Sequence, residues 1–281
     1  MTREIDLLTS PTLKYLREQW WNPAFSEFLR EVLNPRPGRR LLDVGCGAGT
    51  AEIGLGVQQL SQVRFFGVDR DPVRAREALA DTASLNIDMG VAAGDALRLP
   101  FRAASFDAVF CVAVLQHVPD LSGAVAEFAR VVRPGGRVVA VEPDNSARYW
   151  YSSCETGMQA FDLGRRFQMA LAQATGGIAE AGVGPRVSAM FVRHGVTPTA
   201  VRLFPVSVAR LGSPDSDIWA ARQEAIRAQV AACPDEALRR LGSDYLKAID
   251  RYADEAAAAG PAFVEIQNTL LMATVGQRAE S

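Results

Sequence analysis

The sequence predicts an α/β fold with a doubly wound, mostly parallel sheet of seven strands. Two observations predict it: short apolar runs alternate with helical patterns between residues 40 and 142, and the first run ends in a glycine-rich turn. Such alternation is typical of βαβ units, in which helices cover both faces of a parallel sheet. A chain of 281 residues, 48% of them hydrophobic, can bury a full core in one large domain or two small ones.

The first two-thirds of the expected elements follow in a regular order. Asn22-Pro23 places a capping residue before proline at the start of an amphipathic helix, and Ser10-Pro11 marks an earlier helix in the same way. Five strands are then expected at Arg40–Val44, Val63–Val68, Met89–Ala93, Phe106–Val112 and Arg137–Glu142. Helical stretches lie between most of them, around 50–60, 72–84 and 121–132.

The pattern changes beyond residue 145. We expect a helical region over 147–182, a strand at Val201–Val208, helices starting at Ser213-Pro214 and at Asp235, and a last strand at Glu265–Val275. The sequence shows no internal repeat or flexible linker, which favours a single domain over 1–281. Its parts would be an N-terminal helical segment (1–35), a core (36–145) and a remainder with inserted helices (146–281).

The bulk properties exclude several classes of protein. A net charge of −2 and a pI of about 5.8 give no basic stripe for nucleic acid. The four cysteines are widely spaced without a CxxC pair, which argues against a zinc site and a disulfide framework, and we expect no metal. There is no signal-peptide pattern, and the longest apolar stretch, Ala108 to Leu115, is too short to span a bilayer. A cytoplasmic protein without a membrane partner is expected.

The segment from Leu41 to Thr50 carries the most specific signal. Glycines at 45, 47 and 49 remove every Cβ from the inside of a strand-to-helix turn, so a ligand can lie against bare backbone. Asp43 adds a negative charge beside that space. The turn therefore suits a ligand with positive charge or many donors, and suits a nucleotide pyrophosphate poorly.

Two further acids follow later strands. Asp69 ends the second strand, where an acid can accept the hydroxyls of a ribose bound over the turn; a surface acid at a strand end is the alternative. Asp95, in Gly94-Asp95-Ala96 after the third strand, could accept from an exocyclic amine, or could simply be a turn aspartate.

The order of these pieces, together with the helix, Pro-Gly-Gly turn and strand over 130–143, resembles the class I S-adenosylmethionine-dependent methyltransferases, specifically the UbiE-like (methyltransferase type 11) group. The resemblance covers about 40–145. A dinucleotide fingerprint G-x-G-x-x-G would need glycine where Thr50 stands. The family has a Rossmann-like methyltransferase fold with helical lid insertions, and its cofactor is S-adenosyl-L-methionine, which leaves as S-adenosyl-L-homocysteine.

The resemblance also implies roles for individual residues. The turn, with Asp43, Gly45, Cys46, Gly47 and Gly49, would hold the methionine part of the cofactor. Asp69, with its neighbour Arg70, would hold the ribose, and Asp95 with Ala96 the adenine. The segment from Cys111 through Val112 to His117 would form the wall on the sulfonium side.

Candidates for catalysis are fewer. An oxygen acceptor usually needs a base. His117 lies just past the fourth strand and could serve, or could only shape the cofactor wall. Glu142 and Asp144 leave the fifth strand at its carboxyl edge, where either could face an acceptor. His194, before Gly195, is interpreted as a helix C-terminus, and Cys46 and Cys111 as small packing residues as well as neighbours of the cofactor.

Aromatic residues in the terminal regions could build an acceptor pocket. Tyr15, Trp20, Trp21, Tyr149 and Trp150 are the candidates, with core packing as the alternative. The sequence thus favours a methyltransferase with a small, partly hydrophobic or aromatic acceptor, acting as a monomer or homodimer. A protein of the same fold that binds the cofactor without methylating, as a cyclase, decarboxylase or non-catalytic subunit, is the alternative.

Overall fold

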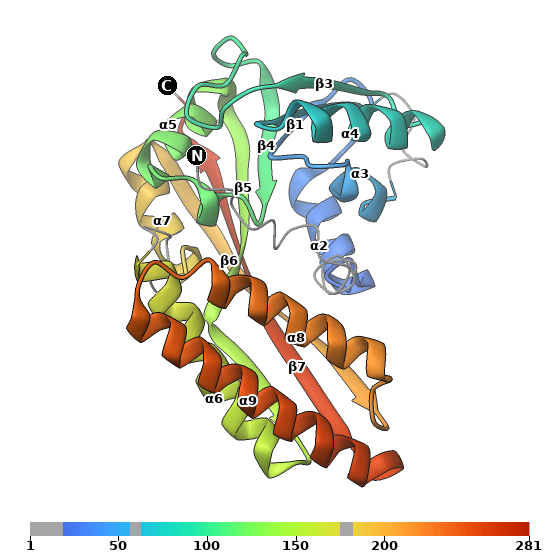
Figure 1. The fold of residues 1–281 in the computed structure, drawn as a ribbon. Coiled ribbons are helices and arrows are strands. Elements are labelled where there is room, and N and C mark those ends of the chain that lie inside the picture. The colour runs from blue at the N-terminus through green and yellow to red at the C-terminus, as the bar shows by residue number, and fades with distance from the viewer. Residues whose placement is uncertain (1–18, 57–62, 175–181, 281) are drawn as a thin grey trace. The chain divides into compact units, whose positions relative to one another are not determined.

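The computed structural model describes residues 19–56, 63–174 and 182–280 (Figure 1). Seven strands form one sheet in the order β3-β2-β1-β4-β5-β7-β6. By contacts, the chain divides into two compact units. Of the described residues, the first unit, here called the core unit, holds those within 20–144, 182–204 and 270–280; the second, the helical unit, holds 19, 145–174 and 205–269.

The core unit contains the parallel part of the sheet. Its strands are β1 (Arg40–Val44), β2 (Arg64–Asp69), β3 (Met89–Ala93), β4 (Phe106–Val112) and the first part of β5 (Val132–Ser152). β1 pairs in parallel with β2 and β4, β2 with β3, and β4 with β5. The α/β fold with a mainly parallel sheet is thereby confirmed, and the carboxyl ends of these strands meet at one edge.

Three helices of the core unit begin where the sequence provides a capping side chain. α2 (Pro23–Leu33) and α4 (Pro72–Ser84) start with proline after Asn22 and Asp71, and α5 (Leu121–Val131) starts after Asp120. Each capping side chain accepts a backbone N–H of the first turn at 2.8–3.0 Å. α7 (Gly184–Arg193) ends at His194, as predicted, ahead of Gly195 with φ +71°. The His194 Nε2 atom is 2.8 Å from the Ser122 hydroxyl.

The helical unit has its own core. α6 (Glu155–Ala174), α8 (Ser216–Ala231) and α9 (Glu236–Ala259, continued by η3, Gly260–Ala262) lie alongside one another (Figure 1). Trp219 and Tyr252 meet edge to face at 5.0 Å between ring centroids. The Arg222 guanidinium pairs with the buried carboxylate of Glu265 at 2.9 and 2.5 Å, and the Tyr252 hydroxyl donates to the same carboxylate at 2.8 Å.

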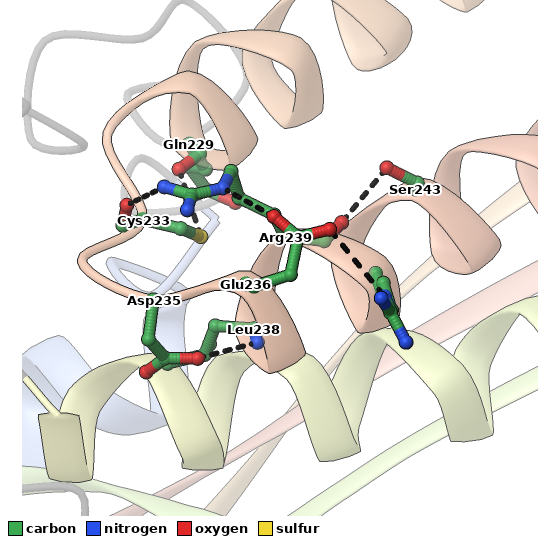
Figure 2. A network of polar contacts seen from close by, with 8 residues as sticks. Gln229, Cys233, Asp235, Glu236, Leu238, Arg239 and Ser243 are labelled. Carbon is green, nitrogen blue, oxygen red and sulfur yellow. Dashed lines mark hydrogen bonds and ion pairs between the residues drawn. The ribbon is translucent and has the colours of Figure 1, made fainter.

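The turn between α8 and α9 is fixed by local hydrogen bonds (Figure 2). Asp235 caps α9 by accepting from the Leu238 N–H at 2.8 Å, and the Arg239 guanidinium donates to the Cys233 carbonyl at 3.0 Å. The predicted helix start at Asp235 is confirmed.

Several predicted boundaries beyond residue 130 were wrong. The region 147–182 is not helical throughout: β5 continues to Ser152, because the aromatic run at 149–151 favours extended backbone, and α6 begins only at Glu155. β6 (Val196–Leu211) and β7 (Val264–Arg278) are longer than predicted. The Pro-Gly-Gly segment is an irregularity inside β5, where the pairing with β4 shifts from Phe106↔Val132 to Ala108↔Arg137.

The first predicted helix after the glycine turn is also shorter than expected. α3 (Thr50–Gly54) ends before Gly56, which has φ +63°, and residues 57–62 lie outside the described part. The helix predicted after Ser10-Pro11 lies outside it as well. No helix among the described residues is long and apolar enough to cross a membrane.

Candidate cofactor and active site

The glycine turn follows β1 and has the conformation that its sequence predicts. Gly45, Gly47 and Gly49 all have positive φ, at +75°, +54° and +76°. The N–H groups of Gly45 and Cys46 both donate to the Val68 carbonyl of β2, at 2.6 and 3.1 Å. The turn is therefore tied to the neighbouring strand before it enters α3.

The three glycines differ in what surrounds them. A Cβ on Gly45 would collide with the side chain of Val114, and one on Gly49 would lie 2.9 Å from the Thr82 methyl group. A Cβ on Gly47 would meet no atom within 4 Å. Close packing thus requires glycine at 45 and 49, whereas Gly47 borders open space in which a ligand can approach the backbone.

Asp69, the last residue of β2, is hydrogen-bonded to the glycine turn beside this open space. Its Oδ2 accepts the Gly47 N–H at 2.8 Å, and its Oδ1 accepts the Asp71 N–H at 2.9 Å. The structure thus brings Asp69 and the glycine turn together, at the end of the second strand where a ribose would be held. Arg70 follows it and is exposed.

Asp95 lies after β3, also on the carboxyl edge of the sheet. Its Oδ1 accepts the Leu97 N–H at 2.9 Å, the geometry of an aspartate that stabilises its own turn. The Asp95 side chain remains exposed and Ala96 is half-buried, so both can still face a base bound over the turn.

Two acids under the turn are buried. Asp43 is 2% exposed, and Glu52, in the first turn of α3, is fully buried. Burial raises the pKa of Asp43 well above its ordinary value, with Glu52 and Asp69 adding to the effect. Burial also raises the pKa of Glu52 to about 7. Sequence reasoning missed Glu52, because α3 is too short for its periodicity to show which residues face inward.

The segment after β4 is organised by Glu142. Its Oε1 accepts the N–H groups of Val114 and Leu115 at 3.0 and 2.8 Å, and its Oε2 accepts that of Gln116 at 3.3 Å. The segment turns at Ala113, which has φ +58°, and continues into η2 (Leu115–His117). Glu142 is fully buried. Burial raises its pKa to about 7, although the three N–H groups oppose the shift.

The other residues predicted for this wall or near it differ in how far their side chains are exposed. Cys111 is fully buried, and its thiol donates to Glu142 Oε1 at 3.8 Å. Burial and the Glu142 charge raise the pKa of Cys111, and burial raises that of Cys46, so neither is activated as a thiolate. Val112 is half-buried, and the His117 side chain is exposed at the end of η2. Asp144 is buried farther along β5.

The predicted aromatic pocket is only partly described. Tyr15 and the Tyr149 side chain lie outside the described residues. Trp20 is buried, and Trp21 packs on Phe25 at 5.2 Å between ring centroids, beside Gly54 of α3. Trp150 belongs to the helical unit, where it packs edge to face on Phe161 at 4.6 Å.

These residues fit S-adenosylmethionine. The open face at Gly47 admits a ligand to the backbone, and Asp69 is held beside it. Glu52 leaves two buried carboxylate oxygens without a hydrogen-bond partner, which suits a cationic ligand rather than an anionic one. Among the described residues, no group of three His, Cys, Asp or Glu side chains could hold a metal ion.

The fold is the Rossmann-like α/β fold expected of a methyltransferase domain, and comparison with known proteins agrees. Residues 42–140 match a family model described as a methyltransferase domain. Over these residues the chain is similar to the class I, S-adenosylmethionine-dependent methyltransferase domains of the UbiE-like group, and S-adenosylmethionine is the cofactor that this similarity implies.

Two relatives and one solved structure illustrate the similarity. An O-methyltransferase of Pyrenophora dematioidea is 31% identical over 150 residues, 47% of this chain and 55% of the relative. A demethylmenaquinone methyltransferase of Beutenbergia cavernae is 35% identical over 138 residues, 48% of this chain and 52% of the relative. The chain thus spans about half the length of these relatives. The crystal structure of the [4+2]-cyclase SpnF superposes with a TM-score of 0.54 at 16% identity, over 92% of this chain and 81% of that one.

Proposed function

We propose that this protein transfers a methyl group from S-adenosylmethionine to a small, partly hydrophobic or aromatic acceptor. The observation that carries the proposal is the junction of the glycine turn with the segment after β4. Val114 packs directly on Gly45, and Glu142 holds the backbone of Val114, Leu115 and Gln116. Packing and hydrogen bonds therefore join the two segments that we propose as the cofactor site and the acceptor wall.

Segments joined in this way suit methyl transfer. The cofactor supplies a methyl group on a positively charged sulfur, where a nucleophile displaces it in line. The work of the chain is to align an acceptor with that methyl group and to keep water out. A wall fixed by hydrogen bonds to a buried carboxylate meets the first requirement, because it does not have to reorganise when the ligands bind.

The two candidate catalytic residues differ in exposure. The Glu142 carboxylate is fully buried and engaged by backbone N–H groups, so we assign it as a positioning residue for the wall. His117 ends η2 with an exposed side chain, one residue past the segment that Glu142 holds. Of the two, His117 is the group able to take a proton from an oxygen acceptor.

The acceptor class rests on sequence composition and on the relatives. The described residues include Trp21 beside α3, an apolar surface near the turn. The names of two relatives specify an oxygen acceptor and demethylmenaquinone. Phenols and quinols are therefore the first acceptors to examine, followed by amines.

A second candidate function is a non-methylating reaction on the same fold. A protein described as a [4+2]-cyclase has the same fold, which shows that this fold also occurs in a protein whose described reaction is not methyl transfer. In that case the cofactor would bind without giving up its methyl group.

Incubation with methyl-labelled S-adenosylmethionine and a panel of phenols, quinols, amines and lipids separates the two candidates. Label in a product supports the methyltransferase. Cofactor binding without transfer to any panel member contradicts that proposal and favours the second candidate. Glu77→Gln, an exposed position of α4, is the control variant and should transfer label as the parent does.

A further inference from the structure

Glu52 is a buried acid with no visible partner. It lies in α3 directly after the glycine turn, and no part of its surface is exposed. Neither of its carboxylate oxygens has a hydrogen-bond partner on another described residue; only the backbone N–H of Glu52 itself favours the charged form. A buried carboxylate without a partner is strongly unfavourable, so this group has to be protonated in the free protein or neutralised by something that binds.

The surroundings of Glu52 contain further acids. The charged and titratable groups that interact with it are Asp43 at the end of β1 and Cys46 in the turn, with Asp69 of β2 acting on the same two groups. Within the described part of the chain, no Lys or Arg is among the groups that shift the pKa of Asp43, Cys46 or Glu52. The underside of the turn is thus an acidic region with no resident cation.

Such a region differs from the ordinary buried acids of this protein. Glu142 is equally buried, but three backbone N–H groups satisfy it. Glu265 is paired with Arg222 and Tyr252. Among these three buried glutamates of the described residues, only Glu52, which acts electrostatically on Asp43 and on Cys46 of the turn, lacks a comparable partner.

We propose that Glu52 is the second carboxyl of the site that binds the cationic amino-acid end of the cofactor, alongside Asp43, and that it gives up a proton to solvent when the ammonium group binds. The proposal rests on the cofactor assignment and is independent of the acceptor. In the free protein, two adjacent buried carboxyls cannot both ionise at low cost. A bound cation lowers that cost, because opposite charges attract strongly where water is excluded.

Binding calorimetry at pH 6.5 in two buffers of different ionisation enthalpy tests this proposal. At that pH the α-ammonium group is charged, and burial, which raises the pKa of both Glu52 and Asp43, leaves the pair of carboxyls holding at least one proton. S-adenosylmethionine and S-adenosylhomocysteine should both release protons on binding to the parent protein. 5′-Methylthioadenosine, which lacks the amino-acid end, should release none.

Glu52→Gln keeps the size of the side chain and removes its acidity. We expect this variant to bind S-adenosylmethionine and S-adenosylhomocysteine about tenfold more weakly, with less proton release than the parent, and to bind 5′-methylthioadenosine as the parent does. Glu52→Asp should retain part of the proton release. Glu77→Gln is the matched control, because it removes an exposed acid of α4 and should change neither quantity.

The outcomes separate the possible failures. Unchanged affinity and unchanged proton release in Glu52→Gln would overturn the proposal, as would an equal loss of affinity for all three ligands in a folded variant. Folding is checked by the near-ultraviolet circular dichroism of each variant. Because no acceptor is present, a failure to methylate any acceptor leaves these results unaffected, and the two proposals can fail separately.

Discussion

Asp69 connects the glycine turn to β2 through a single side chain. It accepts the Gly47 N–H with one oxygen and the Asp71 N–H with the other. Asp69→Ala should therefore weaken the binding of S-adenosylmethionine by at least about tenfold, because it removes both a ribose acceptor and the group that holds Gly47. Titration calorimetry measures the effect, with Asp81→Asn, an exposed position of α4, as control. If Asp69→Ala bound the cofactor as tightly as the parent, the assignment of the whole site would be wrong.

Glu142 acts on three consecutive backbone N–H groups. Glutamine has one acceptor oxygen and would turn an NH2 group toward the N–H of Gln116, so Glu142→Gln should loosen the segment after β4. We expect hydrogen exchange at Val114 and Leu115 to become at least about tenfold faster, because the free energy of local opening falls. Cofactor affinity should change less.

The same variant separates positioning from catalysis. A positioning residue leaves residual methyl transfer with the pH profile of the parent, whereas removal of a general base abolishes that profile. Unaltered exchange at Val114 and Leu115 would contradict the role assigned to Glu142.

At the scale of elements, helix caps are the local features that the sequence specifies best. Asp235 accepts the Leu238 N–H at the start of α9, at 2.8 Å (Figure 2). Asp235→Ala should lower the free energy of unfolding by about 1 kcal/mol. Urea unfolding measures this loss. Asp244→Ala, which removes an exposed ion pair with Lys247, serves as control and should cost at most about 0.5 kcal/mol. Equal losses in both variants would show that the cap contributes nothing specific.

Most elements between residues 40 and 142 were predicted closely, with α3 and the start of β5 as exceptions, because each is specified locally. The apolar run of β1, the cap and proline at Asp71-Pro72, and the cap at Asp120 depend on neighbours in sequence. The end of β5 was not predicted correctly. The Ala- and Gln-rich segment after Ser152 has the composition of a helix, whereas the aromatic residues before Ser152 extend the strand. Strand length there is decided by pairing across the sheet, which no local pattern records.

The site divides in the same way. The glycine turn, Asp69 and Asp95 follow strand ends at short range, so the sequence places them at one edge. The partnerless state of Glu52 and the engagement of Glu142 depend on which residues surround a side chain in space. Because Glu142 is buried and accepts backbone N–H groups, we assign it a positioning role instead of the role of a base.

At the scale of the whole molecule, the two units carry different kinds of buried acid. In the helical unit, Arg222 and Tyr252 hold the pKa of Glu265 below its ordinary value despite its burial. Its stabilising effect is present above the unfolded pKa and is lost as the pH falls through the folded one. In the core unit, burial raises the pKa values of Asp43, Glu52 and Glu142.

The acids with raised pKa values make the stability of the free protein depend on pH in the opposite direction. Their contribution to the free energy of unfolding is fully present below the unfolded pKa of 4.5 for a glutamate and is lost as the pH rises through about 7. Between these two pH values the unfolded chain ionises freely, whereas the folded protein still holds the protons of its buried acids. For each glutamate the loss is at most on the order of 3 kcal/mol. The melting temperature of the cofactor-free protein should therefore fall between pH 5 and pH 8. Glu52→Gln should flatten that fall, whereas Glu77→Gln should follow the parent curve. A parent whose melting temperature is constant or rises over this range would show that the buried acids of the core unit are already neutralised without the cofactor. Glu52 and Asp43 would then have no uncompensated charge with which to bind the ammonium group of the cofactor.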